Sequence, residues 1–266
     1  MNRCLLLCMC LFGSYLISAQ VKTAEMLFNR GKYQRAAVAY ERAFYETREP
    51  HYLLRKVYCY KSLKDYEAAL RTATRINTGN DSLEALVLYE KVLLNFLDSN
   101  YPEAYNDLLR YEVFGYPKDF NTEYVRFVSQ VHLLEWESAK RQLFQDSMYF
   151  DLSEDEIEYI IPADLKIKEI KKARTLSYFL PGVGQMYAGY FGKGLISGTM
   201  VAGAIAFTAY STLNGYFFTG MVPGAAVFYT FYLGGVRYAG QLAEQKNREM
   251  AEATEDRFRE VLNKKS

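Results

Sequence analysis

One long stretch almost without charge constrains this chain more than any other feature. From Thr175 to Val236 the only charged residue is Lys193, and 13 of the 17 glycines lie between Gly182 and Gly240. The remainder of the 266-residue chain is charged and poor in glycine. Long uncharged stretches are typical of segments solvated by lipid. The sequence therefore predicts two parts in different solvents, with the main boundary near residue 172.

Two segments within this stretch are long enough to cross a membrane. Residues 194–213 and 216–236 carry no charge, and a bilayer core of about 30 Å needs about 20 apolar residues in a helix. The polar pair Asn214–Gly215 separates them. We therefore expect a membrane domain over 175–240 with these two spans, followed by a charged helical tail over 241–266.

Small residues recur along both predicted spans. They follow one another at intervals of four: Gly194, Gly198, Ala202 and Ala206 in the first span, Gly220 and Gly224 in the second. Such ridges let helix backbones approach closely where hydrophobic attraction between helices is absent. We expect the ridges to pack the two spans against each other rather than against a second copy. Pro223 is expected in the first turn of the second span, or at a kink.

The N-terminus has the pattern of a secretory signal peptide over residues 1–19. Arg3 is followed by an apolar run from Cys4 to Ile17 and by the small pair Ser18–Ala19. The alternative is an uncleaved membrane anchor. Three of the four cysteines lie in this segment, so Cys59 alone remains after cleavage and an intramolecular disulfide is excluded in the mature chain. Cys59 is expected to be a buried packing residue.

A four-residue pattern recurs through residues 20–147. It places an aromatic residue three positions before a small one: Tyr33–Ala36, Tyr66–Ala69, Tyr101–Ala104 and Trp136–Ala139. Residues three apart share a helix face, so the alanine lets a neighbouring helix approach while the aromatic ring fills the gap. Each pattern begins one helix-like stretch and follows another, as expected for stacked helix pairs. The preceding stretches lie near Val21–Asn29, His51–Ser62, Ser82–Leu97 and Asn121–Leu134.

This region resembles the tetratricopeptide repeat family. The first unit carries the clearest match: Ala24, Leu27, Gly31, Tyr33, Ala36, Tyr40, Ala43 and Pro50. The resemblance implies a glycine in the turn between the two helices of a unit, where a left-handed conformation is cheap. Gly31 has that place in the first unit, and Lys64, Asn100 and Glu135 are assigned to it in the later ones. The expected fold class is all-α, a tetratricopeptide-like helical solenoid followed by a transmembrane helical hairpin.

Members of that family bind peptides or partner domains in a groove lined by the first helix of each unit. The resemblance places eight residues near that face: Phe28, Tyr58, Lys61, Tyr89, Leu93, Phe96, Tyr124 and His132. An aromatic stripe at helical spacing is more often core than binding site. Packing is therefore the competing interpretation for most of them.

The connector, residues 148–174, changes character along its length. Ser153 and Glu156 have capping-box spacing. After Pro162, isoleucines accompany a basic cluster: Lys166, Lys168, Lys171, Lys172 and Arg174, with Ile167 and Ile170. This pattern predicts an amphipathic basic helix lying on lipid headgroups, with a solvated helix that leads into the membrane as the alternative.

The segment before the first span carries the pattern P-G-x-G-Q-x-Y-x-G. Its residues are Pro181, Gly182, Gly184, Gln185, Tyr187 and Gly189. The pattern resembles a signature of small bacterial membrane domains with two spans. Because proline and glycine interrupt a regular helix, we expect a bent re-entrant or interfacial segment over 175–192. Gln185 is expected to satisfy backbone groups freed by the bend, in preference to a ligand role for Gln185 or Tyr187.

Catalytic motifs are missing from the sequence. His51 and His132 lie in no metal-binding spacing, and no nucleophile elbow, P-loop or dinucleotide-binding glycine pattern occurs. We therefore expect no enzyme, no metal and no cofactor. An enzyme that depends on His132 or Gln185 is kept as the third hypothesis. The formal net charge of +1 produces no field that would attract nucleic acid.

Two signals for membrane orientation disagree. The signal peptide would export the repeats, whereas the basic residues that flank the spans would stay in the cytoplasm by the positive-inside rule. Long domains translocate largely regardless of charge, so we expect the chain in the bacterial inner membrane with its repeats in the periplasm. The predicted function is a membrane-tethered scaffold of the cell envelope that binds partner proteins and contacts lipid. The alternative is an oligomeric membrane component that transports or senses a small molecule through its hairpin.

Overall fold

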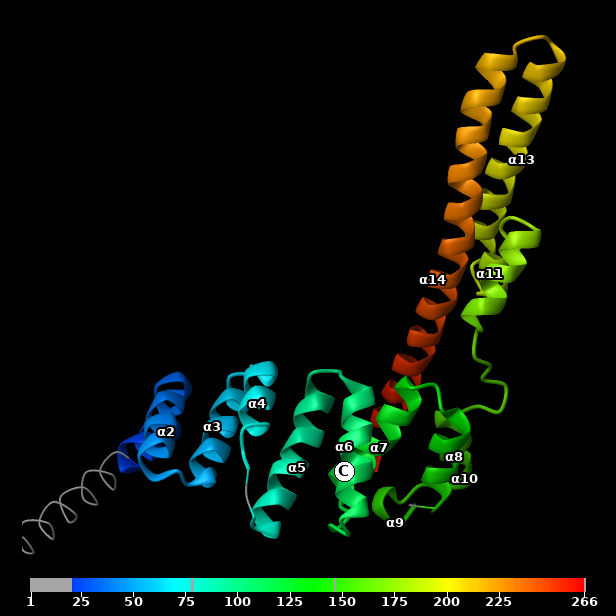
Figure 1. The fold of residues 1–266 in the computed structure, drawn as a ribbon. Helices are drawn as coiled ribbons and strands as arrows, with labels where there is room; N and C mark the ends of the chain where they lie inside the picture. The colour runs from blue at the N-terminus through cyan, green and yellow to red at the C-terminus, as the bar shows by residue number, and fades with distance from the viewer. Residues whose placement is uncertain (1–20, 78, 146, 266) are drawn as a thin grey trace, which may run out of the picture. The chain divides into compact units, whose positions relative to one another are not determined.

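The structure is a computed structural model that describes residues 21–77, 79–145 and 147–265 (Figure 1). Every regular element in these ranges is a helix, so the fold class is all-α. The predicted signal peptide, residues 1–19, lies outside the described residues.

The chain divides into two compact units. The first unit runs to Leu133 and includes Glu137–Asp151, whereas the second holds Leu134–Trp136 and everything from Leu152 onward. The division falls upstream of the boundary expected near residue 172. The connector belongs to the second unit from Leu152 onward, because its helix α10 (Glu154–Ile160) packs against α14 (Phe217–Lys265).

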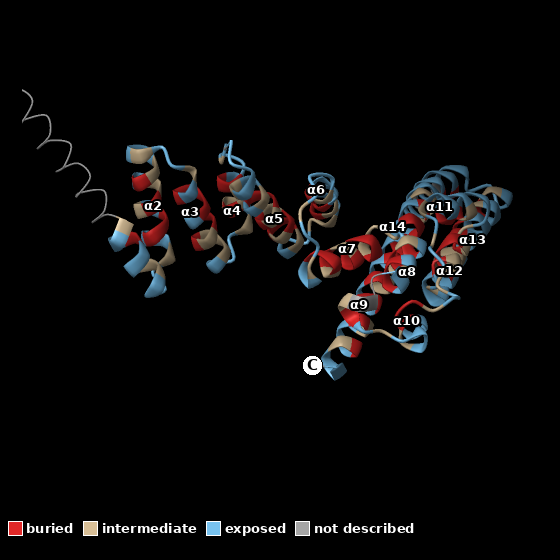
Figure 2. Cartoon of the chain, turned by 90° about the horizontal axis from the view of Figure 1, so that it is seen from below, coloured by how far each residue is buried: buried red, intermediate tan, exposed pale blue. Residues whose placement is uncertain are grey.

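The first unit is a series of short helices in which neighbours in sequence are neighbours in space. A helical stretch over residues 21–29 is followed by α2 (Tyr33–Thr47), α3 (Pro50–Ser62), α4 (Tyr66–Ala73), α5 (Asp81–Leu97), α6 (Tyr101–Val113), α7 (Phe120–His132), α8 (Trp136–Gln145) and α9 (Ser147–Phe150). From α2 to α7 each helix packs against the next. Each of the helices from α2 to α7 carries buried residues beside exposed ones, and α7 is the most extensively buried of them (Figure 2).

The recurring aromatic residues all begin helices. Tyr33, Tyr66, Tyr101 and Trp136 are the first residues of α2, α4, α6 and α8. The small residues three positions later, Ala36, Ala69, Ala104 and Ala139, are wholly buried. A larger side chain at these four positions would push the neighbouring helix away, which is why the pattern marks helix contacts so well.

Four left-handed residues end the first helix of each pair, and each lies two positions before the aromatic anchor. They are Gly31 (φ 71°), Lys64 (φ 59°), Ser99 (φ 58°) and Leu134 (φ 63°). The assignments of Asn100 and Glu135 to this position were wrong by one residue. Asn100 has φ −89° and precedes the first residue of α6. Asparagine tolerates a left-handed conformation, but the turn geometry selects the position and not the residue type.

The single cysteine among the described residues is buried, as predicted. Cys59 lies on α3 with no exposed surface, in a cluster with Tyr40, Ala43 and Tyr52. Burial raises the pKa of its thiol to about 11. The thiol is therefore an inert packing group in the folded chain.

The second unit begins with two short helices that differ from the expected connector. The predicted capping box at the start of α10 is present, since Glu156 N–H donates to Ser153 Oγ and Ser153 N–H donates to Glu156 Oε2. The basic helix starts only at Ile170, the first residue of α11 (Ile170–Phe179). Lys166 and Lys168 precede it because the backbone of Lys168 is engaged by Asn247 on α14, at 2.8 and 2.9 Å.

The uncharged stretch forms α12 (Val183–Tyr187), α13 (Phe191–Leu213) and the first part of α14. Figure 1 shows α13 and α14 side by side, joined at Asn214–Tyr216 where Gly215 is left-handed. Among the described helices one, α13, is long and apolar enough to cross a membrane. The second predicted span, 216–236, is the beginning of a single 49-residue helix that continues through the predicted tail.

One of the two small-residue ridges packs the predicted spans against each other as expected, and the other does not. Gly220 and Gly224 on α14 lie against Ser211 and Thr208 of α13. The ridge on α13 takes no part in this contact, because its second half, Ala202 and Ala206, is exposed and its first half, Gly194 and Gly198, faces residues 181–186. Pro223 lies inside α14 and not in its first turn.

Candidate functional sites

The eight residues of the predicted partner groove are all partly buried, and none is fully exposed or fully enclosed. Three of them come together on α5 to α7. Phe96 contacts Tyr124 with ring centroids 5.9 Å apart, and Tyr101 contacts Phe96 on one side and stacks on His132 at 3.9 Å on the other. These contacts fit both a half-open binding face and the packing interpretation.

The other groove residues make separate local contacts. Lys61 Nζ pairs with Glu90 Oε2 at 2.7 Å, which links α3 to α5. The Tyr89 hydroxyl donates to Asp119 Oδ2 at 3.0 Å, while Phe28 packs on Tyr33 in the first helix pair. Tyr58 and Leu93 are half-buried on α3 and α5. The groove assignment therefore stays a prediction, with several of its polar groups already engaged.

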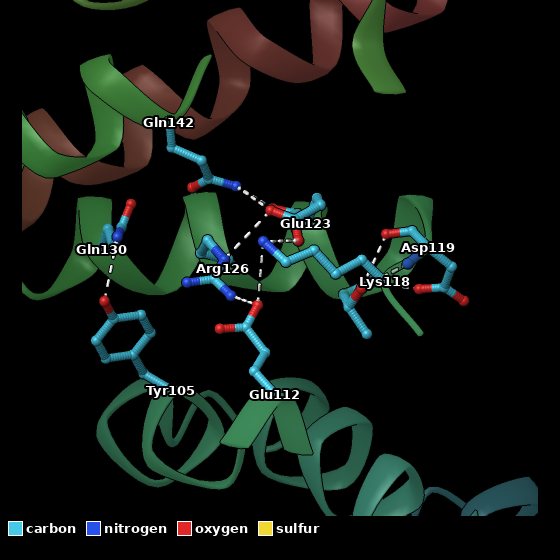
Figure 3. A network of polar contacts seen from close by, with 9 residues as sticks. Tyr105, Glu112, Lys118, Asp119, Glu123, Arg126, Gln130 and Gln142 are labelled. Carbon is cyan, nitrogen blue, oxygen red and sulfur yellow. Dashed lines mark hydrogen bonds and ion pairs between the residues drawn. The ribbon is translucent and has the colours of Figure 1, made fainter. Parts of the chain in front are cut away.

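A buried charged cluster on α6, α7 and α8 was not anticipated from the sequence (Figure 3). Glu123 is wholly buried, and its Oε2 lies 2.9 Å from Gln142 Nε2 and 3.2 Å from Arg126 Nε. Glu112 on α6 also pairs with Arg126, and Lys118 Nζ lies 3.5 and 3.6 Å from the two carboxylates. Two acids and two bases balance, which is the condition under which buried charge is tolerated.

A polar pocket of about 250 Å³ opens beside this cluster, and we call it the α7–α8 pocket. It is lined by Lys118, Arg126, Gln130, Ser138, Arg141, Gln142 and Gln145. Gln130 and Gln142 are each only 5% exposed. The amide N–H of Gln130 donates to the Tyr105 hydroxyl, and that of Gln142 donates to Glu123. Their Oε1 atoms are buried and have no hydrogen-bond partner among the described residues, so two residues that line the pocket each carry an unsatisfied acceptor.

The glycines of the P-G-x-G-Q-x-Y-x-G segment allow close backbone contact. Gly182 is left-handed (φ 91°), and a Cβ there would collide with the backbone of Gly194. A Cβ at Gly184 would collide with the carbonyl group of Ala173, and the Gly184 N–H donates to Ser177 Oγ at 3.1 Å. The segment bends as predicted, and its bend packs on α11 and α13.

The remaining residues of the segment also have local roles. The Tyr187 hydroxyl accepts from the Glu169 N–H at 3.2 Å, and the ammonium groups of Lys168 and Lys172 lie 5.3 and 5.4 Å from its ring centroid. These are cation–π distances. Gly189 is left-handed (φ 95°) and ends α12. Tyr187 therefore ties the basic connector to the bend.

Gln185 differs from its neighbours in the segment. It is 1% exposed, and its Nε2 lies 3.5 Å from the carbonyl oxygen of Gly235 on α14. Its Oε1 has no partner among the described residues. It also lines a cavity of about 430 Å³, which we call the Gln185 pocket: Gln185, Lys193, Ile196, Ser197, Met200, Thr230, Phe231, Gly234, Gly235 and Tyr238. The hydrogen bond of Gln185 among the described residues therefore goes to a carbonyl of α14, and not to backbone groups freed by the bend as expected.

Comparisons with protein-family models, with curated proteins and with solved structures return no match to this chain. Within the described ranges no group of three or more His, Cys, Asp or Glu side chains is placed to hold a metal ion. The features of the described residues that bear on function are therefore the two pockets and the exposed surface of α13 and α14.

Proposed function

We propose that the chain is a membrane-tethered scaffold of the bacterial cell envelope whose first unit holds a partner polypeptide. The observation that carries this proposal is the pair of buried, unpartnered oxygens of Gln130 and Gln142 in the α7–α8 pocket. A buried acceptor without a partner costs about 1–3 kcal/mol, and the backbone N–H groups of a bound polypeptide would supply the missing donors. The two unsatisfied acceptors therefore support binding of a partner polypeptide at this pocket.

The charge of the pocket indicates the kind of polypeptide. Lys118 and Arg126 are neutralised by the carboxylates of the cluster. Among the described residues, the hydrogen bonds of Arg141 at the rim go to the Glu137 carbonyl and the Ser138 hydroxyl, at 3.3 and 3.5 Å. Arg141 is therefore available to pair with a carboxylate of the partner. The aromatic groove predicted from the repeats would extend the contact along the preceding helices.

Membrane tethering is supported by the surface of α13 and the first part of α14. Only 22% of the most apolar window of α13 is buried, which differs from the mostly buried core helix of a soluble protein. The exposed apolar side chains include Leu195, Ile196, Phe207, Leu213, Phe218, Met221 and Val222. In water this surface would be a large apolar patch, whereas in lipid it is solvated. We place both predicted spans in the inner membrane and the first unit in the periplasm.

The experiment that tests the scaffold places a photo-crosslinking amino acid at Gln145, on the exposed rim of the α7–α8 pocket. We expect a discrete adduct in cells whose yield falls about 3- to 10-fold in the Arg141→Glu background, as for loss of one charge-assisted contact. A crosslinker at Arg71, on the exposed face of α4, is the matched control. An adduct unaffected by Arg141→Glu would contradict the proposal.

Topology is tested separately with reporter fusions after residues 150, 216 and 266. The proposal predicts a periplasmic reporter at 150 and at 266, and a cytoplasmic one at 216. A cytoplasmic reporter at 150 would contradict export of the first unit. Flotation of the full chain with membrane vesicles after carbonate washing tests the tether itself.

The Gln185 pocket favours a second candidate function, an oligomeric membrane component that transports or senses a small molecule. Its apolar walls and single buried acceptor are the features of a small-molecule site. Replacing residues 175–240 with an unrelated two-span anchor separates the two functions. The scaffold retains activity after this exchange, whereas the small-molecule component loses it.

A further inference from the structure

The orientation of the Gln185 amide leaves one buried acceptor in a residue that lines the Gln185 pocket. The end of the amide that faces the Gly235 carbonyl must be the nitrogen, because two acceptors would repel. The carbonyl oxygen is thus the end left without a partner in an almost fully buried side chain. A buried oxygen of this kind requires a donor, so the complement of Gln185 is a hydroxyl or an N–H group.

The walls of the pocket are ordered from polar to apolar along the two helices. The α13 residues that line it lie on one face, and the α14 residues run antiparallel to them: Lys193, Ile196, Ser197 and Met200 opposite Thr230, Phe231, Gly234, Gly235 and Tyr238. The cationic end is formed by Lys193 and Tyr238. The other end is formed by Met200 and Phe231, and Gln185 lies between these ends, next to Gly235 and Ser197.

Lys193 is held at its end of the pocket without a carboxylate partner among the described residues. Its Nζ lies 4.7 Å from the ring centroid of Tyr190 and 5.6 Å from that of Tyr238. It is also the only charge between Thr175 and Val236. An ammonium group positioned by two aromatic rings at the edge of an apolar surface is suited to bind an anion.

Gly235 provides the space that the buried amide needs. A Cβ at this position would lie 3.0 Å from Ser197 Oγ and 3.7 Å from Gln185 Nε2. Any side chain would therefore occupy the floor of the pocket beside the amide. The cavity volume of about 430 Å³ falls within the range of about 300–1,000 Å³ that is usual for small-molecule sites.

We propose that the Gln185 pocket binds a single-chain anionic amphiphile that carries a hydroxyl group close to its anionic group. The anion pairs with Lys193, the hydroxyl donates to Gln185 Oε1, and the alkyl chain follows Ile196, Met200 and Phe231 toward the apolar end. The proposal rests on the membrane placement of α13, since such ligands reach the pocket from the bilayer. For the second candidate function, the membrane component that transports or senses a small molecule, the proposal names the class of that molecule.

The test uses the full chain purified in detergent and three matched probes. They are 3-hydroxyhexadecanoate, hexadecanoate, which lacks only the hydroxyl, and hexadecane-1,3-diol, in which a neutral hydroxymethyl group replaces the carboxylate. We expect 3-hydroxyhexadecanoate to bind about 3- to 10-fold more tightly than hexadecanoate, as for one hydrogen bond to a buried acceptor. We expect the diol to bind more weakly than the hydroxy acid by a similar factor.

Two variants test which residues cause the differences in affinity among the probes. Gln185→Leu keeps the side-chain volume and should abolish the preference for the hydroxylated acid. Lys193→Gln should weaken both acids by the same factor and leave the diol unchanged. Thr199→Val, on the exposed part of α13 outside the pocket, is the control. If Gln185→Leu fails to fold by circular dichroism, Gln185→Met serves the same purpose, and the comparison of probes on the unaltered chain stands by itself.

Equal affinity of the unaltered chain for the two acids would overturn the proposal, and so would a preference that survives Gln185→Leu. Binding of 1-palmitoyl-lysophosphatidylglycerol more tightly than the free hydroxy acid would support it and assign the ligand to phospholipid. Weaker binding of that lipid would support it and assign the ligand to a free acid. Flotation of the same preparation with vesicles reports the membrane placement separately, so failure of the tether is distinguishable from failure of the pocket.

Discussion

Glycine serves different purposes in the two units. In the first unit a Cβ built on Gly31, Gly79 or Gly115 would meet no atom within 4 Å. In the second unit an added Cβ would collide with a neighbouring residue at six positions: Gly182, Gly184, Gly194, Gly220, Gly224 and Gly240. The first unit therefore contacts itself through side chains, with alanine as the smallest spacer, whereas the second brings backbone against backbone or side chain.

The difference follows from the solvent proposed for each unit. In water, burial of large side chains provides the main stabilisation, so aromatic rings and alanines fill the space between helices. In lipid, apolar side chains gain little from burial against one another, and close backbone packing takes over. The close contacts at Gly184 and Gly240, which involve α11, indicate that this mode of packing continues beyond the predicted spans.

The largest effect is expected where the first unit buries charge. Glu123→Ala leaves Arg126 without its wholly buried partner and should destabilise the first unit by about 3–5 kcal/mol. Glu103→Ala, on the exposed surface of α6, is the control and should change stability little. Helical circular dichroism, followed through urea unfolding, measures the stability of both variants. Equal stability of the two variants would mean that the charged cluster contributes nothing.

Backbone packing in the second unit is tested by Gly184→Ala. The new Cβ would collide with the Ala173 carbonyl, which cannot rotate away, so we expect a loss of about 1–3 kcal/mol. Gly203→Ala is the matched control, because a Cβ at Gly203 on α13 meets nothing within 4 Å. Thermal unfolding of the full chain in detergent, followed by circular dichroism, should separate the two. Similar unfolding temperatures would remove the proposed distinction between the units.

A side-chain ion pair between the first two helix pairs should have a smaller, pH-dependent effect. The hydrogen bond from Arg75, assisted by Lys56, holds the pKa of Glu41 below its usual value of 4.5. Because the folded pKa lies below the unfolded one, the stabilisation is present above the unfolded pKa and is lost as pH falls through the folded pKa. Glu41→Gln should cost about 1 kcal/mol at pH 7 and progressively less below about pH 4.

Urea unfolding at pH 7 and pH 3 measures this dependence. Glu67→Gln breaks a fully exposed pair with Arg71 and should change stability by less than about 0.5 kcal/mol at both pH values. A loss for Glu41→Gln that is as large at pH 3 as at pH 7 would show that the carboxylate charge plays no part.

The smallest effect concerns the left-handed turns of the first unit. Lys64→Gly removes the steric cost of φ 59° and should stabilise the unit by about 0.5–1 kcal/mol. Lys64→Ala removes the same side chain but keeps the cost, and it serves as the control. Urea unfolding followed by circular dichroism again provides the measurement. A gain of equal size in both variants would assign the effect to the lysine side chain instead of the backbone.

The helices of the first unit could be predicted from the sequence because one local signal, an aromatic residue three positions before alanine, marks every second helix start. The turn position could not be read reliably from residue type. Asn100 is a better left-handed residue than Ser99, yet Ser99 takes that conformation because it lies two positions before Tyr101. The spacing to the anchor is therefore the better guide.

The candidate sites were predictable to different degrees. Gln185 stood out because a glycine-rich pattern surrounds it, but the walls of its pocket come from two distant helices and needed the structure. The cluster around Glu123 left no signal in the sequence. Its members are charged residues separated by three to six positions, a pattern that solvated helix faces share. Only their burial distinguishes them.

The 49-residue helix α14 joins two distant parts of the second unit. At a rise of about 1.5 Å per residue it extends over about 70 Å, and no proline interrupts it after Gly235. Gly235 and Tyr238 border the Gln185 pocket, while Glu260 and Lys265 at the far end contact Tyr159 and Glu156 of α10 at 2.9 and 2.8 Å. The residues that border the Gln185 pocket and those that contact α10 therefore belong to one continuous helix, and the backbone alone fixes the spacing between them.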